Sequence, residues 1–322
     1  MRIAVVGATG RIGAKLTRTL LNAGHQVRAL SRGGPALDAL VEIGAEPFTG
    51  SFDDGTGNLD HFFRNADAAF LMVKTDWNNI HGHYADVALR FFDALRHSSV
   101  KRAVSLTSMG SEVRGSTGHF QPFYQLDQIL NRLEATDLVH LRAGWFMENL
   151  FAWTDAVAQY GGIGWSLDPN VKTPWVATGD IADLAFKELT GQTGRHGVVR
   201  ELGEDFTMSE VTAILAREVG RPVEYRFVDR RRHEVEAEFL GRFGTQEQWL
   251  DDTQTLDALN DGRVRFHDDR PPLPTKLEAF VRDVWKPRYL AAIAAQQPDR
   301  ETFFTWSAQQ QPGDRPNEPL AR

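Results

Sequence analysis

The amino-acid sequence predicts an α/β protein of the Rossmann type, in which a doubly wound parallel sheet is joined by a small C-terminal α/β lobe on the substrate side. Three observations support this prediction. The chain opens with a short apolar strand that leads straight into a glycine-rich turn and an amphipathic helix. Strand and helix patterns then alternate through residue 141, and the helices can serve as the crossovers that parallel strands need. Beyond residue 150 the alternation weakens without a second glycine motif.

The first strand, turn and helix have the order that a dinucleotide site requires. The run over residues 2–6 shows no polar alternation, as expected for a strand buried on both faces. Gly7 permits the tight turn, Gly10 lets the backbone approach a pyrophosphate, and Gly13 lets the helix pack close to the strand. The phosphates then meet the N-terminus of a helix that ends at Gly24, where free N–H groups and the helix dipole favour anions.

The end of the second strand indicates which dinucleotide is bound. This strand covers residues 25–30 and is followed by Ser31 and Arg32. An acidic residue here would accept a hydrogen bond from the 2′-hydroxyl of NAD, whereas an arginine suits a 2′-phosphate. We therefore expect NADP(H), bound through Arg32. The alternative is that Arg32 is a solvated loop residue.

The remaining elements of the core follow in alternation. The predicted helices cover residues 35–43, 59–63, 81–97 and 124–133, and the predicted strands cover residues 46–49, 68–73, 102–106 and 138–141. The strand at 138–141 closes the regular series. The Gly/Ser-rich stretch 110–121 is expected to be a mobile loop beside the site.

We divide the chain into three parts. Residues 1–150 form an NAD(P)-binding Rossmann core, and residues 151–285 form a substrate-side lobe from which the chain returns to the core. Helix or strand patterns in this lobe cover residues 209–219, 223–228 and 234–243. Residues 286–322 are a C-terminal extension rich in Gln and Pro, partly disordered from about residue 307.

Composition excludes several classes of function. With 42% apolar and 25% charged residues, the chain can bury a core and is not a disordered protein. Its net charge of −7 argues against direct nucleic-acid binding or binding to an anionic membrane. The absence of cysteine excludes disulfides, thiolate metal sites and cysteine nucleophiles, and we expect no metal. No apolar run is long enough to span a membrane, and we expect a cytoplasmic protein.

Several segments resemble the NmrA-like family, a group of atypical short-chain dehydrogenase/reductase proteins. These segments are GATGRIG at the N-terminus, VRALSR, GSFDD, SLTS, LRAGWFMENL at residues 141–150 and VATGDIA at residues 176–182. The resemblance covers about residues 1–285. It implies a single NADP-binding Rossmann domain with a small C-terminal lobe that closes a pocket over the nicotinamide.

The resemblance also implies cofactor contacts, position by position. It assigns the pyrophosphate to Gly7, Thr9, Gly10, Arg11 and Ile12, and the 2′-phosphate to Arg32. It assigns the adenine to Phe52 and Asp53, the ribose side to Met72, Val73 and Lys74, and the nicotinamide to Gly144, Trp145 and Phe146. Thr107 lies with Ser108 at the end of the fifth strand. Ser51 stands where the family has an acidic residue.

The catalytic residues are harder to assign, because the short-chain reductase motif Tyr-x-x-x-Lys is incomplete. The lysine of that motif lowers the tyrosine pKa and holds the ribose while the tyrosine protonates the carbonyl oxygen. Here Tyr124 is followed four residues later by Gln128, which can bond a ribose hydroxyl but carries no charge. Tyr124 with Ser108 is the best available donor pair. The alternative is that Tyr124 only packs its ring and bonds its hydroxyl locally.

Aromatic residues indicate a planar substrate. Trp77, Trp153 and Trp175 are our candidates for the substrate pocket, together with the cofactor-side Trp145 and Phe146. A quinone needs less acid assistance than a simple ketone, because its reduced oxyanion is a weakly basic phenolate. Placing the acceptor over the nicotinamide could then supply much of the rate. The competing interpretation is that these tryptophans are core residues.

Two functions follow, and family membership does not choose between them. We favour an NADPH-dependent oxidoreductase that transfers hydride to a quinone or a related conjugated aromatic or carbonyl compound. The alternative is a non-catalytic NADP(H)-sensing regulator that acts through a protein partner, and the missing lysine favours it. Isomerisation or retro-type chemistry with a tightly held cofactor also stays open, since the fold does not fix the reaction. A homodimer is possible in either case.

Overall fold

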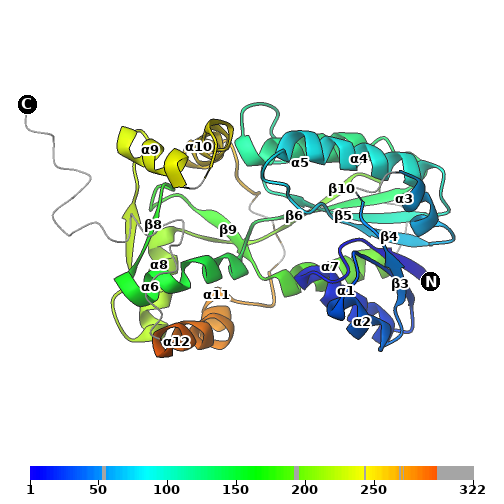
Figure 1. The fold of residues 1–322 in the computed structure, drawn as a ribbon, viewed down its shortest axis with the longest axis horizontal. Coiled ribbons are helices and arrows are strands. Elements are labelled where there is room, and N and C mark those ends of the chain that lie inside the picture. Colours follow the sequence, from blue (N-terminus) through cyan, green and yellow to red (C-terminus); the bar gives the residue numbers. More distant parts are fainter. Residues whose placement is uncertain (53–55, 192–195, 243, 268–269, 271, 296–322) are drawn as a thin grey trace, which may run out of the picture. The chain divides into compact units, whose positions relative to one another are not determined.

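The protein is described from a computed structural model of the 322-residue chain (Figure 1). The structure describes residues 1–52, 56–191, 196–242, 244–267, 270 and 272–295. The expected disordered tail and Asp53 lie outside these residues. The chain forms two compact units, of which the first comprises Met1–Gly144, Thr178–Leu202 and Phe266–Pro271. The second comprises Trp145–Ala177, Gly203–Arg265 and Pro272–Arg322.

A parallel seven-stranded sheet forms the centre of the first unit, in the order β10-β6-β5-β4-β1-β2-β3. Its strands are β1 (Arg2–Val5), β2 (Gln26–Ser31), β3 (Glu46–Thr49), β4 (Ala68–Leu71), β5 (Arg102–Ser108), β6 (Asp137–Ala143) and β10 (Val198–Leu202). Ile3 of β1 pairs with Val27 of β2 on one side and with Ala68 of β4 on the other. The strand order therefore reverses at β1, which is where doubly wound folds bind their ligands. The Rossmann-type fold class predicted from the sequence is confirmed.

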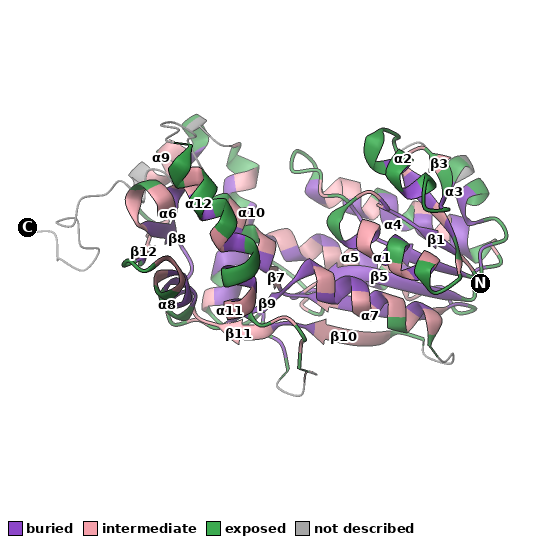
Figure 2. Cartoon of the chain, turned by 90° about the horizontal axis from the view of Figure 1, so that it is seen from below, coloured by how far each residue is buried: buried purple, intermediate pink, exposed green. Residues whose placement is uncertain are grey.

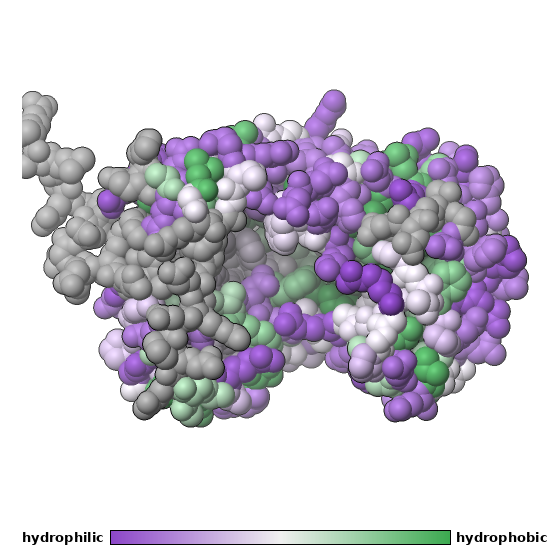
Figure 3. Space-filling model, in the orientation of Figure 1, coloured by the Kyte–Doolittle hydropathy of each residue, from purple (hydrophilic) through white to green (hydrophobic). Residues whose placement is uncertain are grey.

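Helices cover both faces of this sheet (Figure 2). The helices α1 (Arg11–Asn22), α2 (Pro35–Val41) and α7 (Thr178–Thr190) pack on one face. The helices α3 (Thr56–Phe63), α4 (Ile80–Arg96) and α5 (Gln121–Leu130) pack on the other, and the short helix η1 (Gly118–Phe120) precedes α5. Their outward surfaces over α4 and α5 are largely hydrophilic (Figure 3), as expected for helices that bury one side.

The core of the first unit lies between the sheet and the helices α3–α5. Phe62, Phe63 and Phe91 are fully buried there, and the rings of Phe63 and Phe91 lie 6.5 Å apart in an edge-to-face arrangement. All four residues of β4 are buried, because both faces of this central strand are covered. This packing holds the carboxyl ends of the strands in fixed positions.

The sheet gains one more strand after the regular series that ends with the strand expected at residues 138–141. After the second unit's first segment, the chain returns as α7 and β10, and β10 pairs in parallel with β6 from Val198↔Val139 to Leu202↔Ala143. Strand β10 was not predicted, because this edge strand is mostly half-buried and its apolar pattern is therefore weak.

The second unit contains two small sheets surrounded by helices. One sheet joins β7 (Trp145–Phe146), β9 (Thr173–Val176) and β11 (Glu204–Phe206), and the other joins β8 (Gly162–Trp165) and β12 (Glu224–Phe227). The helical elements are η2 (Met147–Trp153), α6 (Thr154–Tyr160), α8 (Met208–Val219), α9 (His233–Arg242), α10 (Gln246–Asn260), α11 (Leu277–Phe280), η3 (Val281–Trp285) and α12 (Lys286–Ala294). Capping boxes begin α8 at Thr207 and α10 at Thr245.

Tryptophans form much of the core of this second unit. The ring of Trp165 lies 5.0 Å from that of Trp145 and 5.6 Å from that of Trp153. Trp285 is fully buried and donates its indole N–H to the carbonyl oxygen of Leu150 at 3.1 Å. Over the described ranges of both units, no helix combines the length and the apolar character needed to cross a membrane.

Candidate functional site

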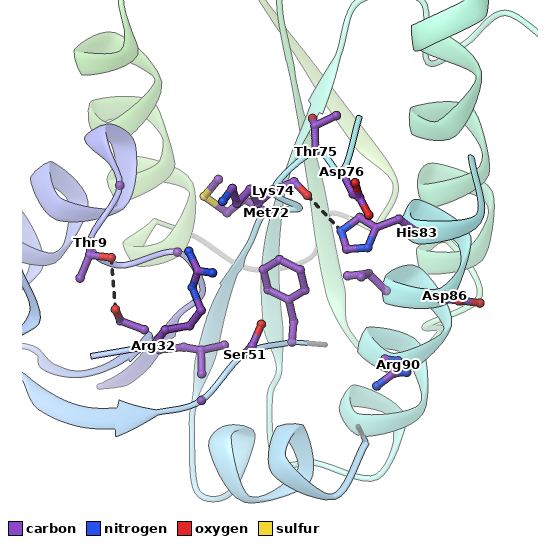
Figure 4. Close-up of a pocket in the computed structure, with 17 residues that line it drawn as sticks. Thr9, Arg32, Ser51, Met72, Lys74, Thr75, Asp76, His83, Asp86 and Arg90 are labelled. Carbon is purple, nitrogen blue, oxygen red and sulfur yellow. Dashed lines mark hydrogen bonds between the residues drawn. The ribbon is translucent and has the colours of Figure 1, made fainter. Parts of the chain in front are cut away.

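A cavity of about 650 Å³ opens in the first unit where β1, β2 and β4 end (Figure 4). The strand order reverses at this point, and the amino-terminal half of α4 forms the opposite wall. Of the residues predicted to contact a cofactor, the cavity brings together Gly7, Thr9, Gly10, Arg32, Phe52, Met72 and Lys74.

The glycine turn has a shape that side chains would prevent. Gly7 has a φ of +68°, and a Cβ on it would lie 2.5 Å from Sδ of Met72. A Cβ on Gly13 would lie 2.2 Å from the carbonyl oxygen of Gly7, so α1 packs against the turn as closely as backbone allows. Gly10 caps α1 without a side-chain hydrogen bond. The turn and the helix N-terminus are therefore shaped to receive an anionic group such as a pyrophosphate.

Arg32 places a positive charge on the β2 side of the cavity. Its side chain is exposed, and its guanidinium makes no ion pair with any carboxylate in the described part of the chain. Beside it, the hydroxyls of Thr9 and Ser31 lie 3.3 Å apart and join the glycine turn to the end of β2. The two lining carboxylates whose positions Figure 4 labels, Asp76 and Asp86, lie on the α4 side. An anion entering beside the glycine turn thus meets a cation.

The segment after β4 is fixed to α4. The carbonyl oxygen of Lys74 lies 3.0 Å from Nε2 of His83, and the hydroxyls of Thr75 and Tyr84 lie 3.1 Å apart. Burial raises the pKa of Tyr84 to about 12, and the hydrogen bond with Thr75 opposes this shift. The ring of Phe52 lies 5.9 Å from that of His83. These contacts give the cavity a defined aromatic wall.

Residues of α4 were not predicted from the sequence. Four residues of this helix line the cavity: His83, Asp86, Val87 and Arg90. Their spacing of three, one and three residues places them on one helix face, and that spacing was the available signal. The sequence could not show that this face meets the glycine turn, because that depends on tertiary packing.

Other predicted cofactor residues lie outside the lining of this cavity. Arg11 and Ile12 begin α1, and Val73 is buried between the lining residues Met72 and Lys74. Thr107 is buried on β5, and the amide of Gly144 donates to the carbonyl oxygen of Leu202 at 2.9 Å. Trp145 and Phe146 form β7 of the second unit.

The proposed donor pair also lies outside this lining. Ser108 ends β5 and is half-buried, while Tyr124 is half-buried on α5. Gln128, where a short-chain reductase would have its lysine, is exposed. Strand β5, which ends at Ser108, and helix α5, which carries Tyr124 and packs beside β5, both lie on the β5 side of the strand reversal.

A buried polar cluster lies on α5 beside these donors. The carboxylate of Asp127 accepts a hydrogen bond from Ser111 at 2.8 Å, and Nδ1 of His140 lies 3.1 Å from its other oxygen. The guanidinium of Arg142 lies 3.4 Å from the same carboxylate. It also lies 3.5 Å from the carboxylate of Glu112. The pKa of Glu112 is raised, mainly because its carboxyl group is removed from water. This cluster could not be predicted from the sequence, since its members come from separate segments.

The candidate substrate tryptophans differ in exposure. Trp77 is 58% exposed after β4, and its ring lies 5.2 Å from that of His119. Trp153 and Trp175 are buried in the second unit, where the indole of Trp175 donates to the hydroxyl of Thr173 at 3.1 Å. The rings of Trp153 and Trp175 lie 6.5 Å apart. Trp153 and Trp175 therefore use at least part of their surface to pack in the core of the second unit.

Comparison with known proteins places these features in a family context. A sequence model of the NmrA-like family matches residues 1–280. Among curated proteins, the NAD(P)H azoreductase of Xenophilus azovorans is 24% identical over 226 residues, which cover 69% of this chain and 76% of that protein.

Solved structures share the fold at low sequence identity. The NADPH-dependent quinone oxidoreductase of Escherichia coli, complexed with NADPH, has a TM-score of 0.73 and 19% identity over 88% of this chain and 99% of that one. The Citrobacter sp. triphenylmethane reductase, complexed with NADP(H), has a TM-score of 0.72 and 21% identity over 87% and 99% of the two chains. Nmra, a negative transcriptional regulator in complex with NADP, has a TM-score of 0.66 and 17% identity over 90% and 97%.

Proposed function

Because this chain belongs to the NmrA-like family, we propose that it is an NADPH-dependent reductase that transfers hydride to a quinone or a related conjugated aromatic or carbonyl compound. The observation that carries the proposal is the cavity at the strand reversal, where the glycine turn and Arg32 meet. Enzymes that act on a quinone, an azo compound or a triphenylmethane dye are among the proteins similar to this chain. Their substrates share an extended conjugated system.

The residues of the cavity suit the parts of an NADP(H) molecule. The N–H groups at the start of α1 would bind the pyrophosphate, with Gly7 and Gly10 keeping side chains out of its way. Arg32 would bind the 2′-phosphate, because a planar guanidinium pairs well with phosphate oxygens and no acidic residue stands directly after β2. Phe52 would pack against the adenine. Asp53 is also assigned to the adenine, but it lies outside the described residues.

The chain's part in the reaction is mainly one of orientation. The bound nicotinamide supplies the hydride, and the protein must hold the acceptor beside it and limit water access. Ser108 at the end of β5 and Tyr124 in the first half of α5 are proposed to donate hydrogen bonds to the acceptor oxygen. Without a lysine at position 128, Tyr124 lacks the neighbouring positive charge that the short-chain reductase motif provides. Acceptors whose reduced form is a weak base should therefore react best.

Steady-state assays can test this function directly. Purified protein would be mixed with NADPH and a panel of quinones, azo dyes, triarylmethane dyes and simple aliphatic ketones, and NADPH oxidation would be followed by absorbance. We expect turnover with conjugated acceptors and little with aliphatic ketones. Tight binding of NADPH without oxidation by any acceptor would contradict the enzyme proposal.

A non-catalytic regulator is the second candidate. It is supported by the Nmra likeness and by the neutral Gln128 in place of the motif lysine. A regulator of this kind should bind NADP⁺ and NADPH with different affinities and retain a protein partner in one redox state only. Equal affinities, together with turnover of a quinone, would exclude this candidate.

A further inference from the structure

We propose that Trp77 and His119 form a recognition site for the hydride acceptor, which selects planar acceptors with two or more rings over single-ring ones. Trp77 provides the surface on which the acceptor stacks, and His119 is a positioning residue that holds the indole. The two rings lie 5.2 Å apart, edge to face, with 70° between their planes. The proposal rests on the proposed function, because it names one class among the conjugated acceptors.

Trp77 is exposed, and its backbone is held in a turn. Its exposed fraction of 58% is the largest among the exposed large hydrophobic side chains of the described residues. On one side of it, Asp76 accepts two backbone amides, that of Asn78 through its carboxylate at 3.0 Å and that of Asn79 through its carbonyl oxygen at 3.2 Å. An exposed indole on a fixed backbone offers a ligand a large flat contact surface.

The segment that carries His119 is also fixed. His119 lies in η1, and its neighbour Phe120 is buried. The amide of Phe120 donates to the carbonyl oxygen of Thr117 at 3.1 Å. The amide of Gly115 donates to Oε1 of Gln121 at 3.1 Å, which ties the stretch after β5 to the start of α5. The imidazole of His119 therefore meets the indole from a defined position.

A second contact joins the two segments that carry the ring pair. The hydroxyl of Thr75, two residues before Trp77, lies 3.1 Å from that of Tyr84 on α4. The ring of Tyr84 in turn lies 4.8 Å from that of Phe123 on α5, which directly follows η1. The segment after β4 is thus held to α5 through Tyr84 as well as through the Trp77–His119 contact.

The ring pair lies on the edge of the sheet where the chemistry is proposed. Strands β4 and β5 are adjacent and parallel, so the segments that follow them leave the sheet at the same edge. Asp76, which lines the cofactor cavity, directly precedes Trp77. His119 lies on the chain between the proposed donors Ser108 and Tyr124. The pair therefore borders the segments that supply both the cavity and the donors.

The shape of the indole accounts for the expected selectivity. The free energy of stacking grows with the apolar area that two rings cover, and a two-ring acceptor covers more of an indole than a single ring does. The contact with His119 restricts rotation of the Trp77 side chain. Less side-chain entropy is then lost when an acceptor stacks on it.

Trp77→Ala tests the stacking surface. KM and kcat would be measured with NADPH and either naphthoquinone or benzoquinone, and calorimetry would give the Kd of each quinone for the NADP⁺ complex, which cannot reduce it. We expect KM and Kd for naphthoquinone to rise about tenfold, with kcat within about twofold and benzoquinone values changed less than about threefold. Comparing variant with wild type for each quinone removes their different intrinsic reactivities. The affinity for NADPH should stay unchanged.

His119→Ala tests the positioning role. It should raise KM for naphthoquinone about threefold, and His119→Phe should restore most of the loss, because phenylalanine keeps an edge-to-face partner for the indole. In the Trp77→Ala background, His119→Ala should have no further effect, since His119 acts through the indole. Additive effects in the double variant would contradict that role.

Two variants serve as controls in the first unit. Ile43→Ala removes a side chain that is 48% exposed, and His97→Ala removes an exposed imidazole. Ile43 precedes β3 and His97 precedes β5, so both lie at the amino edge of the sheet, away from the proposed site. Neither should change KM for either quinone. All variants should keep the circular dichroism spectrum of the wild type.

The remaining results separate this proposal from the proposed function. If the wild type reduced naphthoquinone and Trp77→Ala left its KM and Kd unchanged, the recognition site would be refuted and the reductase function would stand. An equal rise for both quinones would refute the selection by ring number. A wild-type protein that bound NADPH but reduced no acceptor would contradict the reductase function, and the recognition site with it.

Discussion

Ser111 donates a 2.8 Å hydrogen bond to the carboxylate of Asp127, and both side chains are almost completely buried. This contact ties the segment after β5 to α5, the helix that carries Tyr124. The same carboxylate faces His140 and Arg142 of β6. Asp127 therefore links α5 both to the segment after β5 and to β6.

Asp127→Asn should destabilise the protein by about 3 kcal/mol, because removing the carboxylate leaves the buried His140 and the half-buried Arg142 without this partner. Asp93→Asn is the matched control, since Asp93 forms an exposed pair with Arg96 at 3.0 Å on α4. That pair is expected to contribute at most about 1 kcal/mol. Thermal unfolding followed by circular dichroism would compare the two, and equal losses would refute the importance of burial here.

Gly13→Ala should impair both folding and dinucleotide binding. Its Cβ would lie 2.2 Å from the carbonyl oxygen of Gly7, so the turn or the helix must move. Gly241→Ala offers a control within α9, where a Cβ meets nothing within 4 Å. That substitution should be neutral or slightly stabilising, since alanine favours helix. NADPH titration and melting temperature would be measured for both; a Gly13→Ala protein that binds normally would disprove the close-packing argument.

Arg32→Glu should reverse the preference between the two dinucleotides. A carboxylate at the end of β2 repels a 2′-phosphate and can accept a hydrogen bond from a 2′-hydroxyl. The ratio of NADPH to NADH affinity should fall by at least about tenfold. Arg18→Glu, on α1, is a charge-matched control. If both variants lowered the ratio equally, the effect would be one of net charge and not of this site.

Tyr84 should make the folded state sensitive to alkaline pH. Burial raises its pKa from 10.0 to about 12, so the folded state holds this proton more tightly than the unfolded state does. Its contribution to stability is complete below about pH 10 and is lost between about pH 10 and 12. Tyr84→Phe removes the ionisable group, so its stability relative to wild type should improve across that range. A constant difference between the two proteins from pH 8 to 12 would contradict the assignment.

Local patterns predicted the first unit well. The strand, glycine turn and helix over residues 2–22 follow from the spacing of apolar residues and from the positions of the glycines. Up to β6, the predicted helix and strand boundaries agree with the observed ones within a few residues. Strand β10 was missed because half-buried edge residues such as Val198 and Val199 give no clear alternation of apolar and polar side chains. The α4 wall of the cavity and the Asp127 cluster could not be predicted for another reason. Their residues meet only after the helices have packed on the sheet.

The discontinuous course of the chain limits how the protein can be dissected. The first unit obtains α7 and β10 from residues 178–202, after the chain has already built part of the second unit. A chain cut after residue 150 would lack both elements, which would uncover the packing surface of α1 and leave β6 as an open edge with unpaired amide and carbonyl groups. Such a fragment should aggregate, although it retains the whole glycine turn. The minimal dinucleotide-binding piece of this protein therefore reaches at least to Leu202.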